Sequence, residues 1–222
     1  MKKIFLSTIP SKIYLTTIFS LFSFCIFGQN INLDSIKVNV QNENSDFYYE
    51  KLIYKFKFDP TTLSDEEVKN LYYGKKFSKY KPSFFDTDYL DFTKSLSQGN
   101  LKKAIISGEK YLEKDPTNPE VLAYMEMAYK KKDKESKNIL LYSLQAKTIV
   151  DCILKNGDGK TEATAFKVNS IGEEYFIASI LGKNIRTFKR STMLQKTGTI
   201  DVFSKGKETI YFMVYEDLDS FK

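Results

Sequence analysis

The sequence contains no histidine and no tryptophan, and only two of its 222 residues are cysteine. Without histidine the chain can form neither a Ser-His-Asp triad nor the common zinc sites. A Cys-His nucleophile pair is excluded for the same reason. Chemistry based on carboxylates or lysines stays open. The sequence therefore predicts no cofactor and no metal site, and it indicates no catalytic residue.

Apolar runs long enough to cross a membrane are also lacking. The apolar run over residues 13–28 is shorter than the ~20 residues that a spanning helix needs. Three lysines precede this run, and a small residue, Gly28, ends it before Gln29. This order is typical of a signal peptide, so we expect cleavage between Gly28 and Gln29 and an exported, periplasmic or secreted protein. A retained anchor is the alternative, because the large Ile26 departs from the usual small-x-small pattern.

Cleavage changes the charge and the cysteine count. Residues 1–28 carry three lysines and no acid, so their removal lowers the formal net charge from +6 to +3. The remaining lysines are interspersed with acids, which argues against nucleic-acid binding. Cys152 is then the one cysteine left, so no intramolecular disulfide can form. Apolar neighbours predict that Cys152 is a buried structural residue, and we expect no membrane span after cleavage.

Three helices are predicted between residues 85 and 129, where apolar side chains recur every three or four positions. Gly99 ends the first helix, because glycine tolerates the left-handed backbone of a helix end. Ala104 and Gly108 lie on one face of the second helix and let a neighbouring backbone approach closely. A proline-containing turn follows, and Asn118 is placed to cap the third helix.

The spacing of Gly99, Ala104 and Pro116 resembles a tetratricopeptide repeat, a 34-residue helical hairpin. Glu126 departs from that pattern, since the family has a small residue at the close helix crossing. The resemblance implies a scaffold whose inner helix faces hold a protein or peptide partner. The C-terminal part of the chain could instead fill this groove. On this register the inner face, and thus the predicted partner-binding surface, comprises Tyr89, Thr93, Glu120, Ala123, Met127 and Lys130.

The remaining elements complete a prediction of an α+β fold. Ser64 and Glu67 form a capping box that starts a short helix, and residues 136–154 form one long helix. After residue 160, β-branched and aromatic residues predict strands, whereas residues 173–181 fit either a helix or a strand. We expect N-terminal and central antiparallel helical hairpins followed by a small C-terminal β-sheet. The expected regions are a signal peptide (1–28), a linker or extended segment (29–45), a tetratricopeptide-like helical region (46–156) and a small α+β unit packed on the helices (157–222).

Several short stretches resemble an uncharacterised exported family of Bacteroidota, the domain of unknown function 4919. They are FYYEKL (47–52), LYYG (71–74), NGDGK (156–160), GEEYFI (172–177) and ETIYFMV (208–214). The resemblance spans nearly all of the chain after the signal peptide. It implies an envelope or secreted location and brings no known activity.

Two functional hypotheses follow. The first is an exported, noncatalytic scaffold that binds a protein or peptide in the cell envelope. The second is an envelope hydrolase or carbohydrate-handling protein, with a carboxylate site between helices and sheet using Glu173, Glu174 or Asp158. Convergence of two carboxylates in one cleft would favour the second. Residues 173–174 are expected to form an exposed helix start, with Tyr175 turned inward.

Overall fold

The computed structural model describes residues 31–215 except 81 and 83–85. The predicted signal peptide and the predicted helix start at Phe85 lie outside the described residues. The helices are α2 (Leu33–Gln41), α3 (Tyr49–Phe58), α4 (Asp65–Gly74), α5 (Thr87–Ser97), α6 (Leu101–Lys114), α7 (Pro119–Lys132), α8 (Asn138–Lys155) and α9 (Ile171–Ile180), with short 3-10 turns η1 (Pro60–Thr62), η2 (Lys75–Phe77) and η3 (Ile185–Thr187). The strands are β1 (Phe166–Val168), β2 (Lys189–Gln195), β3 (Gly198–Lys205) and β4 (Glu208–Val214).

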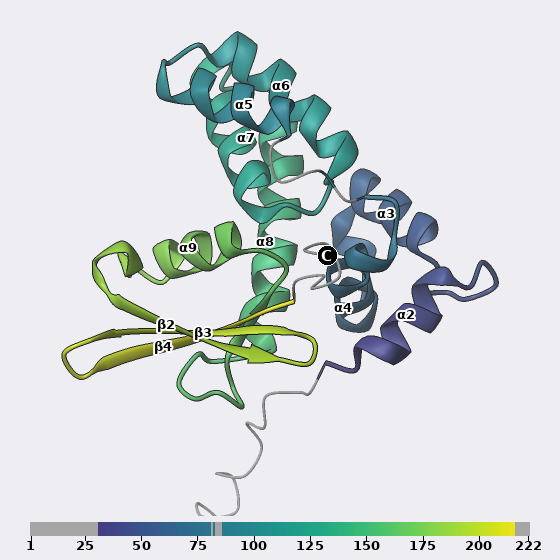
Figure 1. Ribbon diagram of the computed structural model, residues 1–222. Coiled ribbons are helices and arrows are strands. Elements are labelled where there is room, and N and C mark those ends of the chain that lie inside the picture. Colours follow the sequence, from purple (N-terminus) through teal and green to yellow (C-terminus); the bar gives the residue numbers. More distant parts are fainter. Residues whose placement is uncertain (1–30, 81, 83–85, 216–222) are drawn as a thin grey trace, which may run out of the picture.

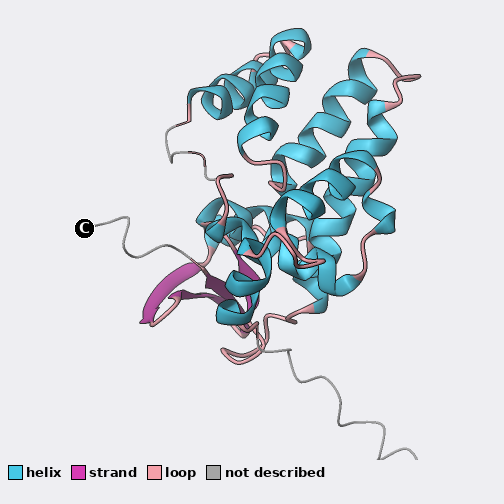
Figure 2. Cartoon of the chain, turned by 90° about the vertical axis from the view of Figure 1, so that its right-hand side faces the viewer, coloured by secondary structure: helices cyan, strands magenta, loops and turns pink. Residues whose placement is uncertain are grey.

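The predicted α+β class is confirmed. Helices α2 to α8 come first along the chain, and the sheet with α9 follows (Figure 1). Figure 2 shows the strands confined to one end of the helical body. The predicted capping box is also present, because the Ser64 hydroxyl accepts the Glu67 amide at 3.3 Å and the Glu67 carboxylate accepts the Ser64 amide at 2.8 Å.

Close helix packing centres on two small residues of α6. Gly99 is exposed between α5 and α6 with φ of 71°, a left-handed conformation that favours glycine. Ala104 is fully buried. A Cβ placed on Gly108 would lie 2.3 Å from the sulfur of Met125 on α7 and 2.9 Å from the Phe92 ring on α5. The missing side chain at Gly108 is therefore what lets α5, α6 and α7 meet.

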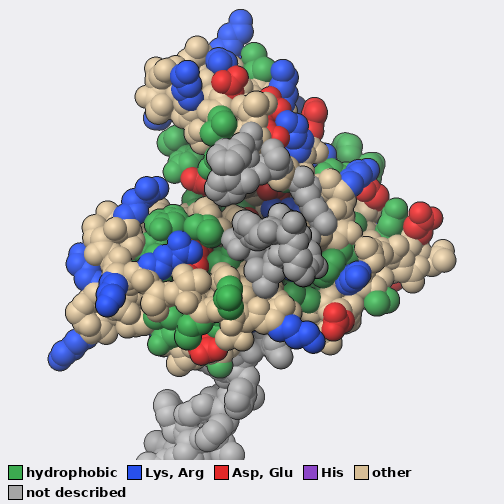
Figure 3. Space-filling view, in the orientation of Figure 1, with side chains coloured by type: hydrophobic (Ala, Val, Ile, Leu, Met, Phe, Trp, Pro, Cys, Tyr) green, Lys and Arg blue, Asp and Glu red, His purple; other side chains and the backbone are tan. Residues whose placement is uncertain are grey.

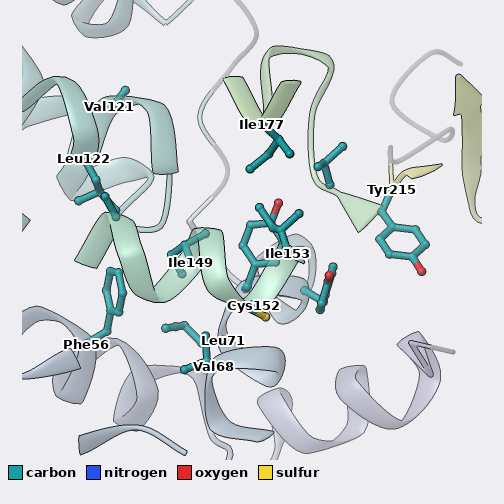
Figure 4. Close-up of a cluster of buried hydrophobic side chains, with 14 of the residues drawn as sticks. Phe56, Val68, Leu71, Val121, Leu122, Ile149, Cys152, Ile153, Ile177 and Tyr215 are labelled. Atoms are coloured by element: carbon teal, nitrogen blue, oxygen red, sulfur yellow. The ribbon is translucent and has the colours of Figure 1, made fainter. Parts of the chain in front are cut away.

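The long helix α8 forms the centre of the hydrophobic core (Figure 4). Its Ile149 and Ile153 are fully buried, and α8 packs against α4, α7 and β1. Figure 4 shows these two side chains between Leu71 of α4 and Ile177 of α9. Burying each such side chain contributes about 1.5–3 kcal/mol. One shared core thus joins the helical part to the sheet-bearing part.

The sheet has the strand order β1-β4-β3-β2. β1 pairs with β4 in parallel, and the other two pairings are antiparallel. The two-residue turn at 206–207 joins β3 to β4. α9 covers one face, where the Tyr175 and Phe203 rings meet edge to face at 6.0 Å. β2 is an edge strand with every side chain exposed, and the sequence did not predict it.

The expected linker at residues 29–45 is wrong over its central part, which forms α2. Asn32 caps this helix by accepting the Ser35 amide at 3.0 Å. Ile36 and Val40 are buried, whereas Val38 between them is 66% exposed. A four-residue step between buried positions is helical, and that step decides the structure of this segment.

A buried polar junction links three parts of the chain. The Tyr72 hydroxyl of α4 donates to the Glu173 carboxylate of α9 at 2.6 Å. Lys75 of η2 pairs with Asp115, in the turn between α6 and α7, at 2.9 Å, and lies 3.9 Å from Glu173. Buried charges persist only when they are paired or hydrogen-bonded. These contacts therefore hold the N-terminal helices, the central helices and α9 in one arrangement.

Candidate partner-binding cleft

An open cleft lies between α7 and the segment formed by α9 and η3. Its volume is about 430 Å³. One wall belongs to the central helices and the other to the sheet-bearing part, so the cleft exists because these two parts pack together. Its lining residues are Glu120, Tyr124, Tyr175, Phe176, Ser179, Gly182, Lys183, Asn184, Ile185 and Arg186.

The α7 wall is set by the start of that helix. Asn118 caps α7 by accepting the Val121 amide at 3.0 Å, and Pro119 occupies the first helical position. Glu120 follows, and Tyr124 comes one turn later on the same face. The Tyr89 hydroxyl of α5 donates to the Glu120 carboxylate at 3.1 Å. The hydrogen bond from Tyr89 of α5 thus fixes the position of the Glu120 side chain.

The opposite wall is set by the end of α9. Gly182 has φ of 73° and reverses the chain there, and the Lys183 amide donates back to the Ala178 carbonyl at 2.8 Å. Ile185 is then buried in the core, which fixes η3. Arg186 follows with its guanidinium over the Tyr175 ring, 5.2 Å from the ring centre. This cation–π contact orients the Arg186 side chain along the cleft wall.

The electrostatics of the cleft combine one acid and one guanidinium. Burial raises the pKa of Glu120 above its ordinary value, although the Tyr89 hydrogen bond and the positive charge of Arg186 act in the opposite direction. Burial also raises the pKa of Tyr124, so this phenol stays neutral near neutral pH. The cleft therefore offers aromatic rings, a carboxyl group that holds its proton more tightly than usual, and an exposed guanidinium.

The six predicted partner-binding residues are only partly brought together here. Glu120 lines the cleft, and Tyr89 supports it from α5. Thr93 bonds to the carbonyl of Tyr89 in its own helix. The others are half-buried Ala123, Met127 at 36% exposure and exposed Lys130, which continue along α7 outside the cleft lining.

Sequence reasoning missed Tyr124 and the whole α9–η3 wall. The repeat register places the neighbours of Tyr124 on the inner face of the helix, so it did not predict Tyr124 as a site residue. The second wall had a visible signal in residues 183–190, which hold four cations and no acid. The sequence did not predict that this run packs beside α7.

The three carboxylates considered for a hydrolase do not share a cleft. Glu173 and Glu174 are both buried, so the expected exposed helix start is wrong. Glu173 faces Tyr72, whereas Glu174 faces the sheet, 3.9 Å from Arg190. Asp158 lies in a loop, where it accepts the Lys160 amide at 3.0 Å. Neighbouring helix positions point in different directions, and here each carboxylate serves a separate structural contact.

The sheet-side carboxylate belongs to a compact network. Arg190 of β2 pairs with Asp201 of β3 at 2.5 Å, and Thr192 also donates to Asp201. Burial alone would raise the pKa of Asp201, but hydrogen bonds from Arg190 and Thr192 lower it below the ordinary value. The network joins the edge strand to α9.

A second cavity of about 430 Å³ lies between η1, α4 and α8. Its lining includes Asp65, Lys155 and the buried Cys152. Burial raises the pKa of the Cys152 thiol to about 12, so the thiol is protonated at neutral pH and is no nucleophile. The prediction of a buried cysteine is confirmed. In the part of the chain that the structure describes, no group of three or more acidic or cysteine side chains is arranged to hold a metal ion.

Fold and cleft together define an α+β protein in which a helical body and a small mixed sheet enclose an open cleft. The chain belongs to the family described as a domain of unknown function, DUF4919, which matches residues 34–222. No curated protein matches the chain, and no solved structure matches it. Among the helices of residues 31–215 that are described, none combines the length and the apolar character that crossing a bilayer requires.

Proposed function

We propose that this chain is an exported, noncatalytic protein that binds a peptide or protein segment in the cell envelope. The observation that carries the proposal is the cleft between α7 and α9–η3, with its aromatic lining and its supported Glu120. Binding sites for extended segments are concave, and aromatic residues dominate their energetics. An envelope hydrolase would need carboxylates at an open cleft, and Glu173 and Glu174 are buried apart from it.

The tetratricopeptide-like part of the proposal rests on α5 to α8. The pairs α5/α6 and α7/α8 pack side by side, and Gly108 of α6 lies against Phe92 of α5 and Met125 of α7. In such repeats the inner face of the first helix of each pair meets the partner. Here α7 is that helix, and Glu120 lies on the face that α9 leaves open. The C-terminal unit thus forms one wall of the groove and leaves room for a further segment.

The export part of the proposal rests on the sequence of residues 1–28, whose basic start and apolar middle are typical of a signal peptide. Together with the resemblance to an exported Bacteroidota family, it implies a periplasmic or secreted protein. Mass spectrometry of the protein from the cell envelope or medium tests this, and the expected first residue is Gln29. A chain that retains residues 1–28 would contradict export with cleavage.

Selection of peptides tests the binding part. Random 12-residue peptides displayed on phage are selected on the purified protein, and enriched peptides are then measured with variants. Tyr124→Ala should weaken their binding by about fivefold or more, since truncating an aromatic anchor commonly costs over 1 kcal/mol. The matched control is Phe58→Ala, which removes an aromatic side chain that is 71% exposed on α3, away from the cleft.

Two outcomes would count against the cleft. One is that no peptide is enriched above background. The other is that Tyr124→Ala and Phe58→Ala bind alike while circular dichroism shows both folded. A third variant, Met127→Asp, reports how far the bound segment extends along α7. Loss of binding in this variant indicates that the segment continues past the cleft toward Lys130.

A further inference from the structure

The run from α9 into β2 concentrates positive charge beside the cleft. Residues 183–190 contain Lys183, Arg186, Lys189 and Arg190 without any acid. Lys183 and Arg190 are already engaged, because each forms an ion pair with a carboxylate of the sheet. Figure 3 shows Lys and Arg side chains gathered over the sheet-bearing part, at the left of the view. The surface is hollowed between the sheet-bearing part and the helical part.

Arg186 differs from these engaged neighbours. It is exposed, it lines the cleft, and within the described residues no carboxylate lies within ion-pair distance of it. Its guanidinium lies over the Tyr175 ring, 5.2 Å from the ring centre. A guanidinium fixed by stacking presents its N–H groups as a fork that matches a carboxylate. Arg186 is therefore positioned to receive an anionic group that enters the cleft.

The cleft also has an aromatic part, beside the polar Ser179, Lys183 and Asn184. Tyr124, Tyr175 and Phe176 line it, and Ile185 closes its floor. The same face of α7 continues past the cleft toward Met127, so a bound segment need not end inside it. Such a surface suits an internal, extended stretch of peptide in which an apolar or aromatic side chain neighbours an acidic one.

We propose that the cleft recognises an acidic peptide segment, in which an Asp or Glu side chain binds the Arg186 guanidinium and a neighbouring apolar or aromatic side chain packs between Tyr124 and Phe176. This inference rests on the proposed peptide-binding function and specifies its ligand. The complementarity of charge between Arg186 and the peptide carboxylate carries it. The group that binds Arg186 is a side-chain carboxylate within the segment, not the carboxylate at a chain end.

Glu120 supplies an internal check on this assignment. Its carboxyl interacts electrostatically with Arg186 across the cleft, so an ionised Glu120 competes with an incoming carboxylate. The groups that face Glu120 from neighbouring elements are Tyr89 of α5 and Arg186 of η3, with Tyr124 on α7 itself. Replacing Glu120 with Gln removes this competing charge and keeps an acceptor for the Tyr89 hydroxyl. Glu120→Gln should therefore bind acidic peptides more tightly than the wild type.

The experiment uses two matched arrays of 12-residue peptides, N-acetylated and C-amidated. Each peptide carries one Phe or Tyr next to one variable position, which is Asp or Glu in the first array and Asn or Gln in the second. The wild-type protein should bind the acidic array about tenfold more tightly, a ratio within reach of one charge-assisted contact. Arg186→Gln should abolish this preference, and Glu120→Gln should increase it.

Lys189→Gln is the matched control. It removes one positive charge from the same run, at an exposed position of β2 outside the cleft lining. Long-range attraction by net charge would respond equally to Arg186→Gln and Lys189→Gln, whereas a direct contact responds only to Arg186→Gln. Equal loss in the two variants overturns the inference.

The remaining outcomes separate this inference from the proposed function. Equal binding of both arrays, weakened by Tyr124→Ala, overturns the acidic ligand and leaves peptide binding intact. Binding that appears only when the peptides carry a free C-terminal carboxylate overturns the choice of a side-chain carboxylate. Absence of binding in both arrays and in the phage selection overturns the two proposals together.

Discussion

Tyr72 and Glu173 are 101 residues apart in the sequence, and a buried hydrogen bond of 2.6 Å joins them. Glu173 also accepts the amide of Asn169 at 2.8 Å, and the amide side chain of Asn169 donates to the Tyr72 carbonyl at 2.9 Å. The three groups form a closed set of contacts between α4 and the start of α9. The position of α9, and with it one wall of the cleft, depends on this set.

Removing the Tyr72 hydroxyl should destabilise the protein. In Tyr72→Phe the Glu173 carboxylate loses a buried donor, and such a loss costs about 1–3 kcal/mol. The free energy of unfolding in urea measures the effect. Tyr54→Phe is the matched control, because Tyr54 is 65% exposed and its change should stay within about 0.5 kcal/mol. Equal stabilities of the two variants would show that the buried bond contributes nothing net.

Glu173 should also make stability depend on pH. Burial raises the pKa of Glu173 above its ordinary value of 4.5, more than Lys75 and Tyr72 lower it. The folded protein then holds a proton that the unfolded chain has lost between these two pKa values. The contribution of Glu173 to stability is therefore complete below pH 4.5 and declines as the pH rises through the folded pKa.

Urea unfolding of the wild type and Glu173→Gln across this pH range tests the sign. The glutamine cannot ionise, so the stability of the variant relative to the wild type should rise with pH. Glu113→Gln, at an exposed position of α6, serves as the comparison and should follow the wild-type profile. Parallel profiles for Glu173→Gln and the wild type would mean that Glu173 does not titrate differently on folding.

Adding a methyl group at Gly108 should disturb the central helices. The new Cβ of Gly108→Ala would meet the Met125 sulfur at 2.3 Å, and overpacking of this kind typically costs about 1–3 kcal/mol. Gly172→Ala is the control, because its Cβ meets only the Ser170 hydroxyl at 3.8 Å and the change should be neutral or slightly stabilising. Thermal unfolding of both variants provides the comparison. A Gly108→Ala protein as stable as the wild type would show that α5, α6 and α7 can separate at little cost.

Cys152 should react with thiol reagents only when the helical body opens. Cys152 is 5% exposed, and burial raises the pKa of its thiol to about 12. Incubation with an aromatic disulfide reagent at pH 8 should leave Cys152 unmodified in the native protein and modify it fully in urea. Mass spectrometry of the digested protein locates the label. Rapid labelling without denaturant would place Cys152 in an opening segment of the second cavity.

The sequence predicted well the features that local chemistry determines. The capping box of Ser64 and Glu67 needs only four consecutive residues, and the turn at Gly99 needs only a left-handed backbone. The small residues Ala104 and Gly108 also lie where the helices touch. In each case the residue type allows few alternatives, so the prediction and the structure agree.

The features that the sequence did not reveal depend on distant partners. Charged residues usually lie at the surface, so the sequence predicts that Glu173 and Glu174 are exposed. Their burial is compensated by Tyr72, which donates to Glu173, and by Arg190, which lies 3.9 Å from Glu174. β2 has no strong strand pattern, and it forms because β3 offers a free edge. Tyr124 and Arg186 become parts of one cleft only through the packing of α9 beside α7. The candidate site was therefore predicted only at Glu120 and its support Tyr89.

The pairing of β1 with β4 has a consequence for biosynthesis. β4 is the last described strand to leave the ribosome, yet it occupies an interior place in the sheet, between β1 and β3. Before β4 is synthesised, β1 has no described strand to pair with, and β2 and β3 form only a two-stranded hairpin. The sheet therefore cannot be completed before β4 is synthesised. A protease that cleaves the chain before residue 208 would leave a fragment without β4. The unpaired edge of β3 in that fragment would promote aggregation.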